Sequence, residues 1–566
     1  MRYGGGIVVV AVVAAAGYGI YEATKPTPVA TPTPTVSPTP TPTPTITPTP
    51  AVSAETLYLA SSEDFKNIDP GQCRETADYN TIMQVYEGLT IIRGWETRAQ
   101  PCLATSWEVS EDGICYTWHL RKGVPFHSGD PFNAECVKYS FERLLTMNVA
   151  NVYKIAPYLD RVEVVDEHTV KTYLKFPWAA WPECVADQVA AVVNPKFVEA
   201  HGGIVAGQPN EYMITHEDGT GPYILEEFVP RERIVFKSYP DYWGGWEGKH
   251  VRRIVRRNIL EVATRLMLLA RGDVDVAYVP SGNLPELEKI IESEKLPLVV
   301  QRTHEGNPIY SNKQFFIYLN CAKLPFSDIN MRLAFQHAFD YDTFVKEVIH
   351  GYGIRSGGLI PAGIWGHVDD MPLYDFDLVK AKEYIEKASP EAKQSLAKGL
   401  TIYYVPGNAL LKEGALMFQG DLAKIGVKME IREYDYGSWL DMLKAEPDKA
   451  NQIGETWWWE SAGDPYFFTL YARKDYWPPR GWNCTFWGSD EIDGQLDQAA
   501  REQNPTVRKE MYRKVEMAWH DGAAWIIIYQ QSGLLMMDNI YANWVHGWAF
   551  NPCSYNHYYD VWKEPA

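Results

Sequence analysis

The chain has 566 residues, of which 46% are apolar and 22% are charged, a composition typical of a folded protein with two to four structural units. Its net charge of −19 argues against a nucleic-acid partner, because phosphates are bound by clustered Lys and Arg side chains. The excess of acidic residues favours an exposed protein that stays soluble.

The first fifty residues predict a chain that is exported and held at the cell surface. Residues 4–21 form an uncharged run after Arg2, with a length between those of a signal-peptide core and a minimal membrane helix. Residues 26–50 are rich in alternating Pro and Thr, which favours a polyproline-like stalk of roughly 80 Å. Because a stalk is useful when its base is fixed, we favour a retained membrane anchor at 1–25. A cleaved signal followed by a loose tether is the alternative.

Export also sets expectations for covalent modification. The chain's eight cysteines could form up to four disulfides, whose pairing cannot be read from the sequence. Asn483 begins an Asn-Cys-Thr signal for N-glycosylation, and the threonines of the stalk suit O-glycans.

Strand and helix signals alternate from Glu55 onward, which predicts an α/β fold with an added mixed or antiparallel region. Residues 107–120 suggest a hairpin with an acidic-Gly turn, and Asn133 is a suitable N-cap for a helix. Residues 260–270 favour a helix that Gly272 ends, followed by a strand at 274–276. Residues 400–405, 409–425 and 427–431 predict a strand, a helix and a parallel strand, which is a βαβ unit.

Several sequence blocks resemble one protein family. They include YEGL from Tyr86, PCLATSW from Pro101, DGICYTWHLRKGV from Asp112, FHSGDPFNA from Phe126, YSFERL from Tyr139, GTGPYILEEF from Gly219, YLNCAKLPFSDINMRLAFQHAFD from Tyr318 and GGLIPAGIWG from Gly357. In this order they are similar to the family 5 solute-binding proteins of ABC importers, the oligopeptide- and dipeptide-binding type. The resemblance runs from about Glu55 to the C-terminus.

This resemblance implies a large, three-domain, periplasmic-binding-protein-like fold whose two lobes close over a ligand. Domain I is expected at 51–86, 215–303 and 530–566, domain II at 87–214, and domain III at 304–529. The implied function is that of an extracellular receptor that captures a small oligomer and delivers it to the permease and ATPase subunits of an importer. We expect a monomer on the outer face of the membrane, with no cofactor, no metal and no catalysis.

The segment GETWWWESAGDPYFF, from Gly454, is the main candidate for ligand contact. In peptide-binding relatives the matching segment lines the cleft, and an Asp four residues before Pro binds the peptide ammonium. Here that position, before Pro465, is Ser461, and the nearest acid is Glu460. Trp457, Trp458, Trp459, Asp464 and Tyr466 complete the candidates. Because side chains alternate along a strand, part of this set is expected to pack in the core.

The same segment leaves the chemistry of the ligand open between two classes. Most of the family binds peptides, whereas the missing Asp and the tryptophans beside Glu455 favour an oligosaccharide, whose rings stack on indole. We place the oligopeptide first and the oligosaccharide as the alternative.

Five further residues are candidates for ligand contact, and by the same resemblance three of them, Phe316, Tyr318 and Phe65, border the cleft. Phe316 and Tyr318 lie on an expected strand, where alternate members would be core. Trp365 lies in a Gly-flanked loop, Arg355 could bind a peptide carboxylate or form a structural ion pair, and Phe65 follows the first strand.

Enzyme motifs are missing from the sequence. No phosphate loop, HExxH zinc site or GxSxG elbow is present, and no residue cluster suits nickel or haem. A glycoside hydrolase needs only two carboxylates beside aromatic platforms, so Glu455, Glu460 and Asp464 keep that reading as a minor alternative. The other minor alternative is a surface sensor or adhesin built on the same fold.

Overall fold

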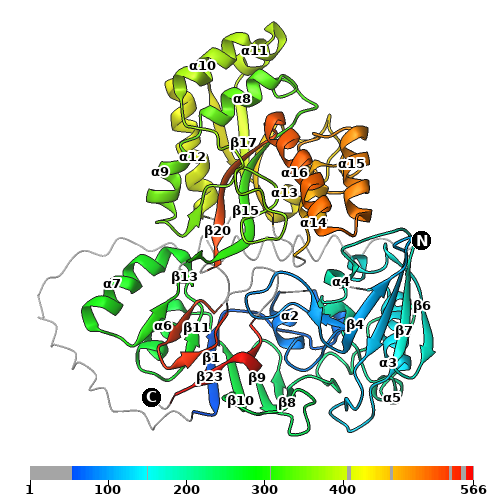
Figure 1. Ribbon diagram of the computed structural model, residues 1–566. Helices are drawn as coiled ribbons and strands as arrows, with labels where there is room; N and C mark the ends of the chain where they lie inside the picture. The colour runs from blue at the N-terminus through cyan, green and yellow to red at the C-terminus, as the bar shows by residue number, and fades with distance from the viewer. Residues whose placement is uncertain are drawn as a thin grey trace, which may run out of the picture. The chain divides into compact units, whose positions relative to one another are not determined.

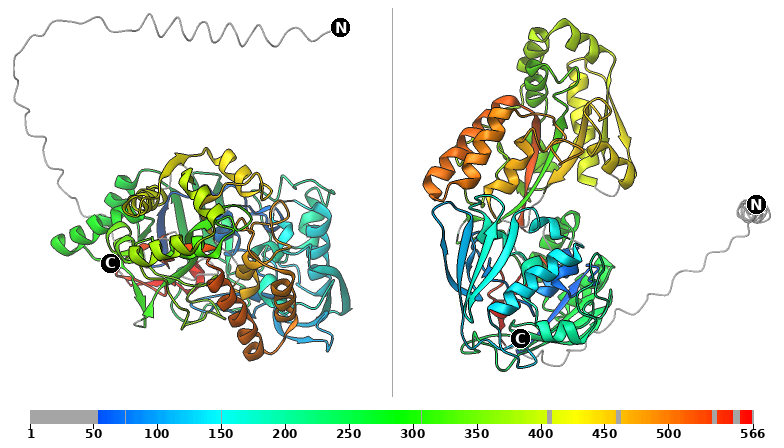
Figure 2. Two further views of the ribbon diagram at one scale, coloured as in Figure 1. Left: turned by 90° about the horizontal axis from the view of Figure 1, so that it is seen from above. Right: turned by 90° about the vertical axis from the view of Figure 1, so that its right-hand side faces the viewer.

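Three large sheets organise the folded part of the chain in the computed structural model (Figures 1 and 2). The structure describes residues 54–74, 76–149, 151–305, 307–404, 409–458, 463–533, 538–549 and 556–564. The expected anchor and stalk lie outside these residues, as do Trp459, Glu460 and Ser461. Within the described ranges, no helix is long and apolar enough to cross a bilayer.

The largest sheet gathers strands from distant parts of the chain. Its seven strands are, in order, β12 (Leu298–Val300), β21 (Ile540–Ala542), β11 (Val276–Ala277), β1 (Thr56–Ser61), β10 (Arg253–Asn258), β9 (Arg233–Ser238) and β8 (Tyr223–Val229). β1 runs parallel to β10 and β11, and the other pairs are antiparallel. α6 (Val262–Ala270) and α7 (Leu284–Glu294) connect its strands. Gly272, with φ at +75°, follows α6 as predicted.

A four-stranded antiparallel sheet lies between the first and second strands of that sheet in sequence. It has the order β4 (Ala104–Val109), β5 (Cys115–Leu120), β7 (Thr169–Leu174) and β6 (Leu159–Asp166). The predicted hairpin is β4–β5, and Gly113 has φ at +71° in its turn. α3 (Ala134–Met147) packs on β6 and β7, and the Asn133 side chain caps it as predicted. The nearby helices are α2 (Thr76–Ile82), α4 (Trp181–Cys184) and α5 (Pro195–Ala200).

The third sheet contains the segment singled out in the sequence. Its order is β16 (Gly353–Ile354), β20 (Trp525–Ser532), β15 (Tyr310–Leu319), β19 (Ile453–Trp458), β17 (Leu400–Tyr404) and β18 (Met429–Glu433). β17 and β18 pair in parallel across α12 (Ala409–Lys424), which confirms the predicted βαβ unit. The other helices of this region are α8 (Ile329–His337), α9 (Tyr341–Thr343), α10 (Leu378–Lys387), α11 (Pro390–Ala397), α13 (Tyr436–Leu443), α14 (Pro465–Thr469), α15 (Asp490–Arg501) and α16 (Pro505–Gly522).

The buried apolar side chains form two clusters. One is built mainly around the seven- and four-stranded sheets, and the other around the six-stranded sheet. Two cores are what a two-lobed protein needs, because each lobe must be stable while the other moves. The domain bounds given above stay a prediction.

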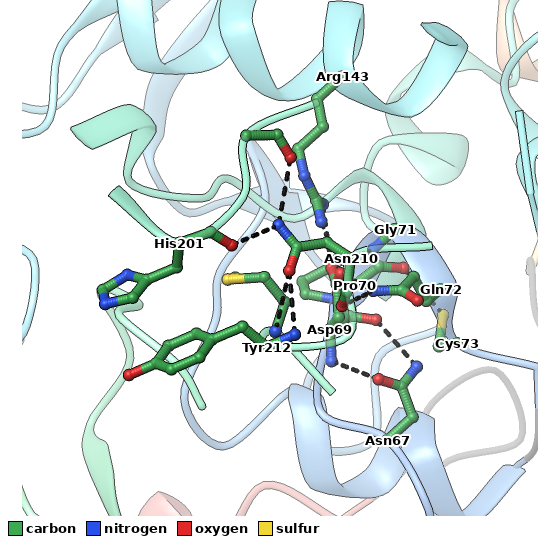
Figure 3. A network of polar contacts seen from close by, with 12 residues as sticks. Asn67, Asp69, Pro70, Gly71, Gln72, Cys73, Arg143, His201, Asn210 and Tyr212 are labelled. Carbon is green, nitrogen blue, oxygen red and sulfur yellow. Dashed lines mark hydrogen bonds and ion pairs between the residues drawn. The ribbon is translucent and has the colours of Figure 1, made fainter. Parts of the chain in front are cut away.

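A buried polar network fastens the segment after β1 to α3 (Figure 3). Asp69 accepts hydrogen bonds from the two terminal nitrogens of Arg143, at 2.9 and 2.5 Å, and from Gly71 N at 3.0 Å. Gln72 Nε2 donates to the carbonyl of Asn210 at 2.8 Å. Asp69 and Arg143 are both buried, so each charge depends on the other for compensation. The ion pair therefore fixes this segment against α3.

The expected modifications need two corrections. The seven cysteines within the described ranges are all free thiols, and the eighth, Cys553, lies outside them. Most of the seven are buried singly in the cores, as small apolar side chains. Asn483 is also buried and donates from its side-chain amide to the carbonyls of Arg473 and Trp487, so in the folded protein it offers no free amide to a glycan.

Candidate functional site

The first two tryptophans of the Trp run lie at the end of β19 and face opposite sides of the sheet. Trp457 is opposite Phe315 on β15 and stacks on Trp439, with ring centroids 5.2 Å apart and planes 13° apart. Trp458 packs edge-on against Tyr471 at 4.3 Å. Both indoles are half-buried. The alternation expected of a strand is therefore present, and each indole keeps a partly exposed surface.

Lys313 lies beside Trp457. Its ammonium nitrogen is 5.1 Å from the ring centroid of Phe315 and 5.4 Å from that of Trp457. Loss of hydration lowers its pKa to about 8. No described carboxylate forms an ion pair with it, so its contacts are cation–π interactions.

Glu455 lies two residues before Trp457 on the same face of β19, and is fully buried. Neither of its carboxylate oxygens has a hydrogen-bond partner among the described residues. Burial raises its pKa well above the usual range, because the charged form of the side chain loses its hydration. Glu455 therefore cannot offer a sugar the exposed carboxylate that the oligosaccharide interpretation required.

Asp464 is part of a structural ion pair. Both of its oxygens accept hydrogen bonds from Arg508 on α16, each at 2.7 Å. One of them also accepts from Tyr466 N at 2.9 Å, which caps α14. The carboxylate is fully buried, and the bonds from Arg508 neutralise its charge. Asp464 thus holds the chain in place directly after the segment 459–462.

Tyr466 and Phe467 contact the four-stranded-sheet region rather than an open surface. The Tyr466 ring is 5.4 Å from that of Trp178 and 6.3 Å from that of Tyr158. Phe467 is 5.8 Å from the same tryptophan. Close by, Ala179 N donates to the carbonyl of Ala500 at 2.8 Å. These residues bridge the two regions.

Three other candidates are core residues. Phe316 is buried and stacks on Trp525 at 3.7 Å, and Tyr318 is buried in the same cluster. Phe65 is fully buried against Phe228 in the other cluster. β15 is an inner strand of its sheet with both faces covered, so the expected alternation of core and cleft residues does not occur along it.

Arg355 and Trp365 each contact charged side chains. Arg355 pairs with Asp342 at 3.2 Å and donates to the carbonyl of Tyr374, so it has the structural role that was the alternative expectation. Trp365 lies beside two guanidinium groups, those of Arg98 at 4.5 Å and Arg508 at 5.4 Å from its ring.

Trp365, Arg98 and Arg508 line a cavity of about 240 Å³. Glu183 lines it too, and its Oε1 accepts a hydrogen bond from Arg98 Nε at 2.7 Å. Burial raises the pKa of Glu183, because its carboxylate is removed from water.

Sequence reasoning missed Lys313, Arg98, Glu183 and Arg508. Lys313 did carry a signal, because it is the one charged residue in the strand YSNKQFFIYL. The others gave none, since their partners are distant in sequence. Among the described residues, no group of three or more His, Cys, Asp or Glu side chains could hold a metal ion.

Comparisons with known proteins agree with the sequence blocks. The profile of a family described as bacterial extracellular solute-binding proteins, family 5 Middle, matches residues 98–478. A dipeptide-binding protein of Escherichia coli (strain K12) is 27% identical over 501 residues, which cover 84% of this chain and 89% of that protein.

Two solved structures share the fold. HbpA2 from Haemophilus parasuis superposes with a TM-score of 0.77 at 23% identity, covering 90% of this chain and 100% of that one. DppA from Helicobacter pylori, solved with the peptide STSA, superposes with a TM-score of 0.69 at 24% identity, covering 90% and 98%. Together with the profile, which spans more than half of the chain, they lead to one conclusion: the chain belongs to the bacterial extracellular solute-binding proteins of family 5.

Proposed function

We propose that this protein is the receptor of an ABC importer and that its solute is a short peptide. The observation that carries the proposal is the match over most of the chain to a relative named as a dipeptide-binding protein. The similarity in fold to a relative solved with a four-residue peptide supports it. The peptide would lie beside Trp457 and Trp458, next to the segment 459–462.

We propose the peptide in preference to the oligosaccharide for a physical reason. Sugar hydroxyls need accessible carboxylates or amides next to an aromatic platform. Glu455 is fully buried, and Asp464 is neutralised by Arg508. The relatives reported above give the sugar no support either.

The same two observations argue for a binder without chemistry. Glycoside hydrolysis needs one carboxylate that protonates the leaving group and a second, ionised one across the bond. Neither Glu455 nor Asp464 is accessible enough to take part, so Glu460, which lies outside the described residues, has no second carboxylate among the acids considered. The protein is then proposed to work by closure of its lobes, which is favoured to the extent that the solute binds the closed form better.

The surroundings of the receptor are part of the proposal. The uncharged run and the Thr-Pro stalk would anchor a monomer on the outer face of the membrane and keep it close to its permease and ATPase partners. Such tethering raises the effective concentration of the receptor at the permease. Removing the stalk should leave solute binding unchanged and impair uptake; an equal loss of both would contradict this role.

A titration tests the solute class. The full chain would be titrated with two panels, mixed di- to pentapeptides and α- and β-linked oligosaccharides, while tryptophan emission is recorded and the products are examined by mass spectrometry. Saturation by peptides alone is expected. Saturation by sugars alone would refute the peptide, and cleavage of either panel would refute the binder.

A further inference from the structure

An aromatic contact joins the region of the six-stranded sheet to that of the four-stranded sheet. Tyr466 and Phe467 lie on α14, which follows β19 in the chain, and both rings lie edge-on to Trp178, at 5.4 and 5.8 Å. Tyr158 stacks on Trp178 at 3.6 Å and meets Tyr466 edge-on at 6.3 Å. We call these four residues the aromatic clasp.

The clasp is packed like the interior of a single domain. Trp178 is fully buried, and Phe467 is 9% exposed and belongs to the apolar cluster of the seven- and four-stranded sheets, although its helix follows a strand of the other sheet. Ala500, on α15, belongs to the same cluster, and its carbonyl accepts a hydrogen bond from Ala179 N at 2.8 Å. Edge-to-face ring pairs stabilise a contact beyond the area that they bury. The two regions are therefore joined through side chains that contact each other directly.

The clasp is also held in position from the side of the six-stranded sheet. Asp464 caps α14 through Tyr466 N and accepts two hydrogen bonds from Arg508 on α16, so α14 presents its rings from a fixed place. α14 begins shortly after the segment 459–462, beside which the peptide is proposed to lie. One short stretch of chain thus connects the clasp to the proposed peptide site.

We propose that the aromatic clasp holds the two lobes closed by itself, so that it sets the affinity for the solute without touching it. This inference rests on the proposed function, since it concerns the regulation of the same receptor. The clasp joins protein to protein, so its contacts do not require a solute. Weakening it should lower the affinity for every solute by one factor, because apparent affinity falls with the fraction of receptor in the competent form. It should also speed association, because more of the receptor is open to entry.

Pulsed electron paramagnetic resonance of the full chain measures closure directly. Spin labels carried on p-acetylphenylalanine replace Val165 on β6 and Leu416 on α12, which are 50% and 49% exposed and lie in the two regions that the clasp joins. The chain with an intact clasp is expected to give one short distance, which saturating di- to pentapeptides leave unchanged. Tyr466→Ala combined with Phe467→Ala should give a longer distance, which peptides return to the original value.

Stopped-flow tryptophan emission gives a second readout. Loss of two buried ring contacts is expected to shift the closing equilibrium by about 100-fold, which takes the closed fraction from about nine-tenths to about one-tenth. The affinity for each peptide then falls about tenfold, while association becomes about tenfold faster because the open fraction rises by that factor. Damage to a solute site weakens binding without accelerating association, so the combination of weaker and faster binding identifies the clasp.

Two single variants complete the design. Tyr384→Ala is the matched control, because Tyr384 is a half-buried ring that stacks on His337 within the region of the six-stranded sheet, at 5.8 Å. It should change neither the distance nor the association rate. Tyr466→Ala alone keeps the buried Phe467 and should speed association about fivefold and weaken affinity about twofold, which keeps the test decisive when the double variant does not fold.

Each result decides between the possibilities. A long distance in the chain with an intact clasp, shortened by peptides, would overturn the inference and leave the peptide proposal intact. A folded double variant that keeps the short distance without peptide would overturn it as well. Failure of every peptide to bind would refute the proposed function, while the distances measured without peptide would still decide whether the clasp holds the lobes.

Discussion

Replacing Asp464 by Asn is expected to destabilise the protein strongly while leaving peptide affinity nearly unchanged. The carboxylate is fully buried and accepts hydrogen bonds from both terminal nitrogens of Arg508, each at 2.7 Å. An Asn keeps the cap on the Tyr466 N–H, because Asn and Asp cap helices equally well. What the substitution removes is the charge, which leaves the Arg508 guanidinium buried without an anion.

The magnitude follows from that uncompensated charge. Removing one partner of a buried ion pair costs about 3–5 kcal/mol. Arg508 keeps its bonds to the carbonyl of Ala499, at 3.0 Å, and to the Tyr512 hydroxyl, at 3.1 Å, so a value near the lower end is expected. Removing both charges, in Asp464→Asn with Arg508→Met, should recover much of the loss, because no unpaired charge remains.

Urea unfolding followed by circular dichroism measures the effect, and calorimetric peptide titration measures affinity. Asp369→Asn is the matched control, because Asp369 is an exposed acid 3.9 Å from Lys509 and its loss should not change stability measurably. The reasoning fails if Asp464→Asn is no more destabilising than the control, or if the double variant shows the sum of the two single losses. Lost affinity at unchanged stability would instead assign Asp464 to the solute.

Three further predictions concern other parts of the structure. Burial raises the pKa of Glu516 in the folded protein to about 8, whereas the pKa in the unfolded chain is near 4.5. Between these two values the unfolded state loses the proton first, so the stability of the folded state falls as pH rises. The melting temperature of Glu516→Gln should therefore fall less than that of the wild type from pH 5 to 8. A Cβ at Gly219 would overlap the carbonyl oxygen of Val85, so Gly219→Ala should prevent folding. In α12 the methyl group added by Gly420→Ala meets no atom, so this variant should be more stable by about 0.5–1 kcal/mol in denaturant unfolding. A thiol reductant should leave the melting temperature unchanged, because the seven described cysteines are free; a drop would reveal a disulfide.

The parts of the fold that were predicted correctly depend on neighbours in sequence. The β4–β5 hairpin has its turn glycine at Gly113, α3 has its cap at Asn133, and the βαβ unit has Gly426, with φ at +82°, between its helix and its second strand. Each of these signals acts within a few residues, so a single sequence is enough to read it. The two-lobed fold was predicted from the resemblance of the sequence blocks to the family.

The candidate site was predicted less well, because its chemistry depends on distant partners. Asp464 meets Arg508 from 44 positions away, and nothing in its own segment shows that the charge is already used. Phe316 and Tyr318 are buried because β15 is an inner strand, which is a property of sheet order and not of the strand sequence. Lys313 was overlooked for the same reason, since a cation becomes noteworthy only when its surroundings lack an acid.

The place of β21 in the largest sheet has a consequence for biogenesis. This strand, Ile540–Ala542, lies between β11 and β12 and pairs with both, so β12 joins the sheet only through a strand that lies far from it in sequence. A chain growing from its N-terminus can therefore pair β1 with β10 and β11 early, whereas β12 has no neighbour in this sheet until β21 follows, so this edge of the sheet forms last.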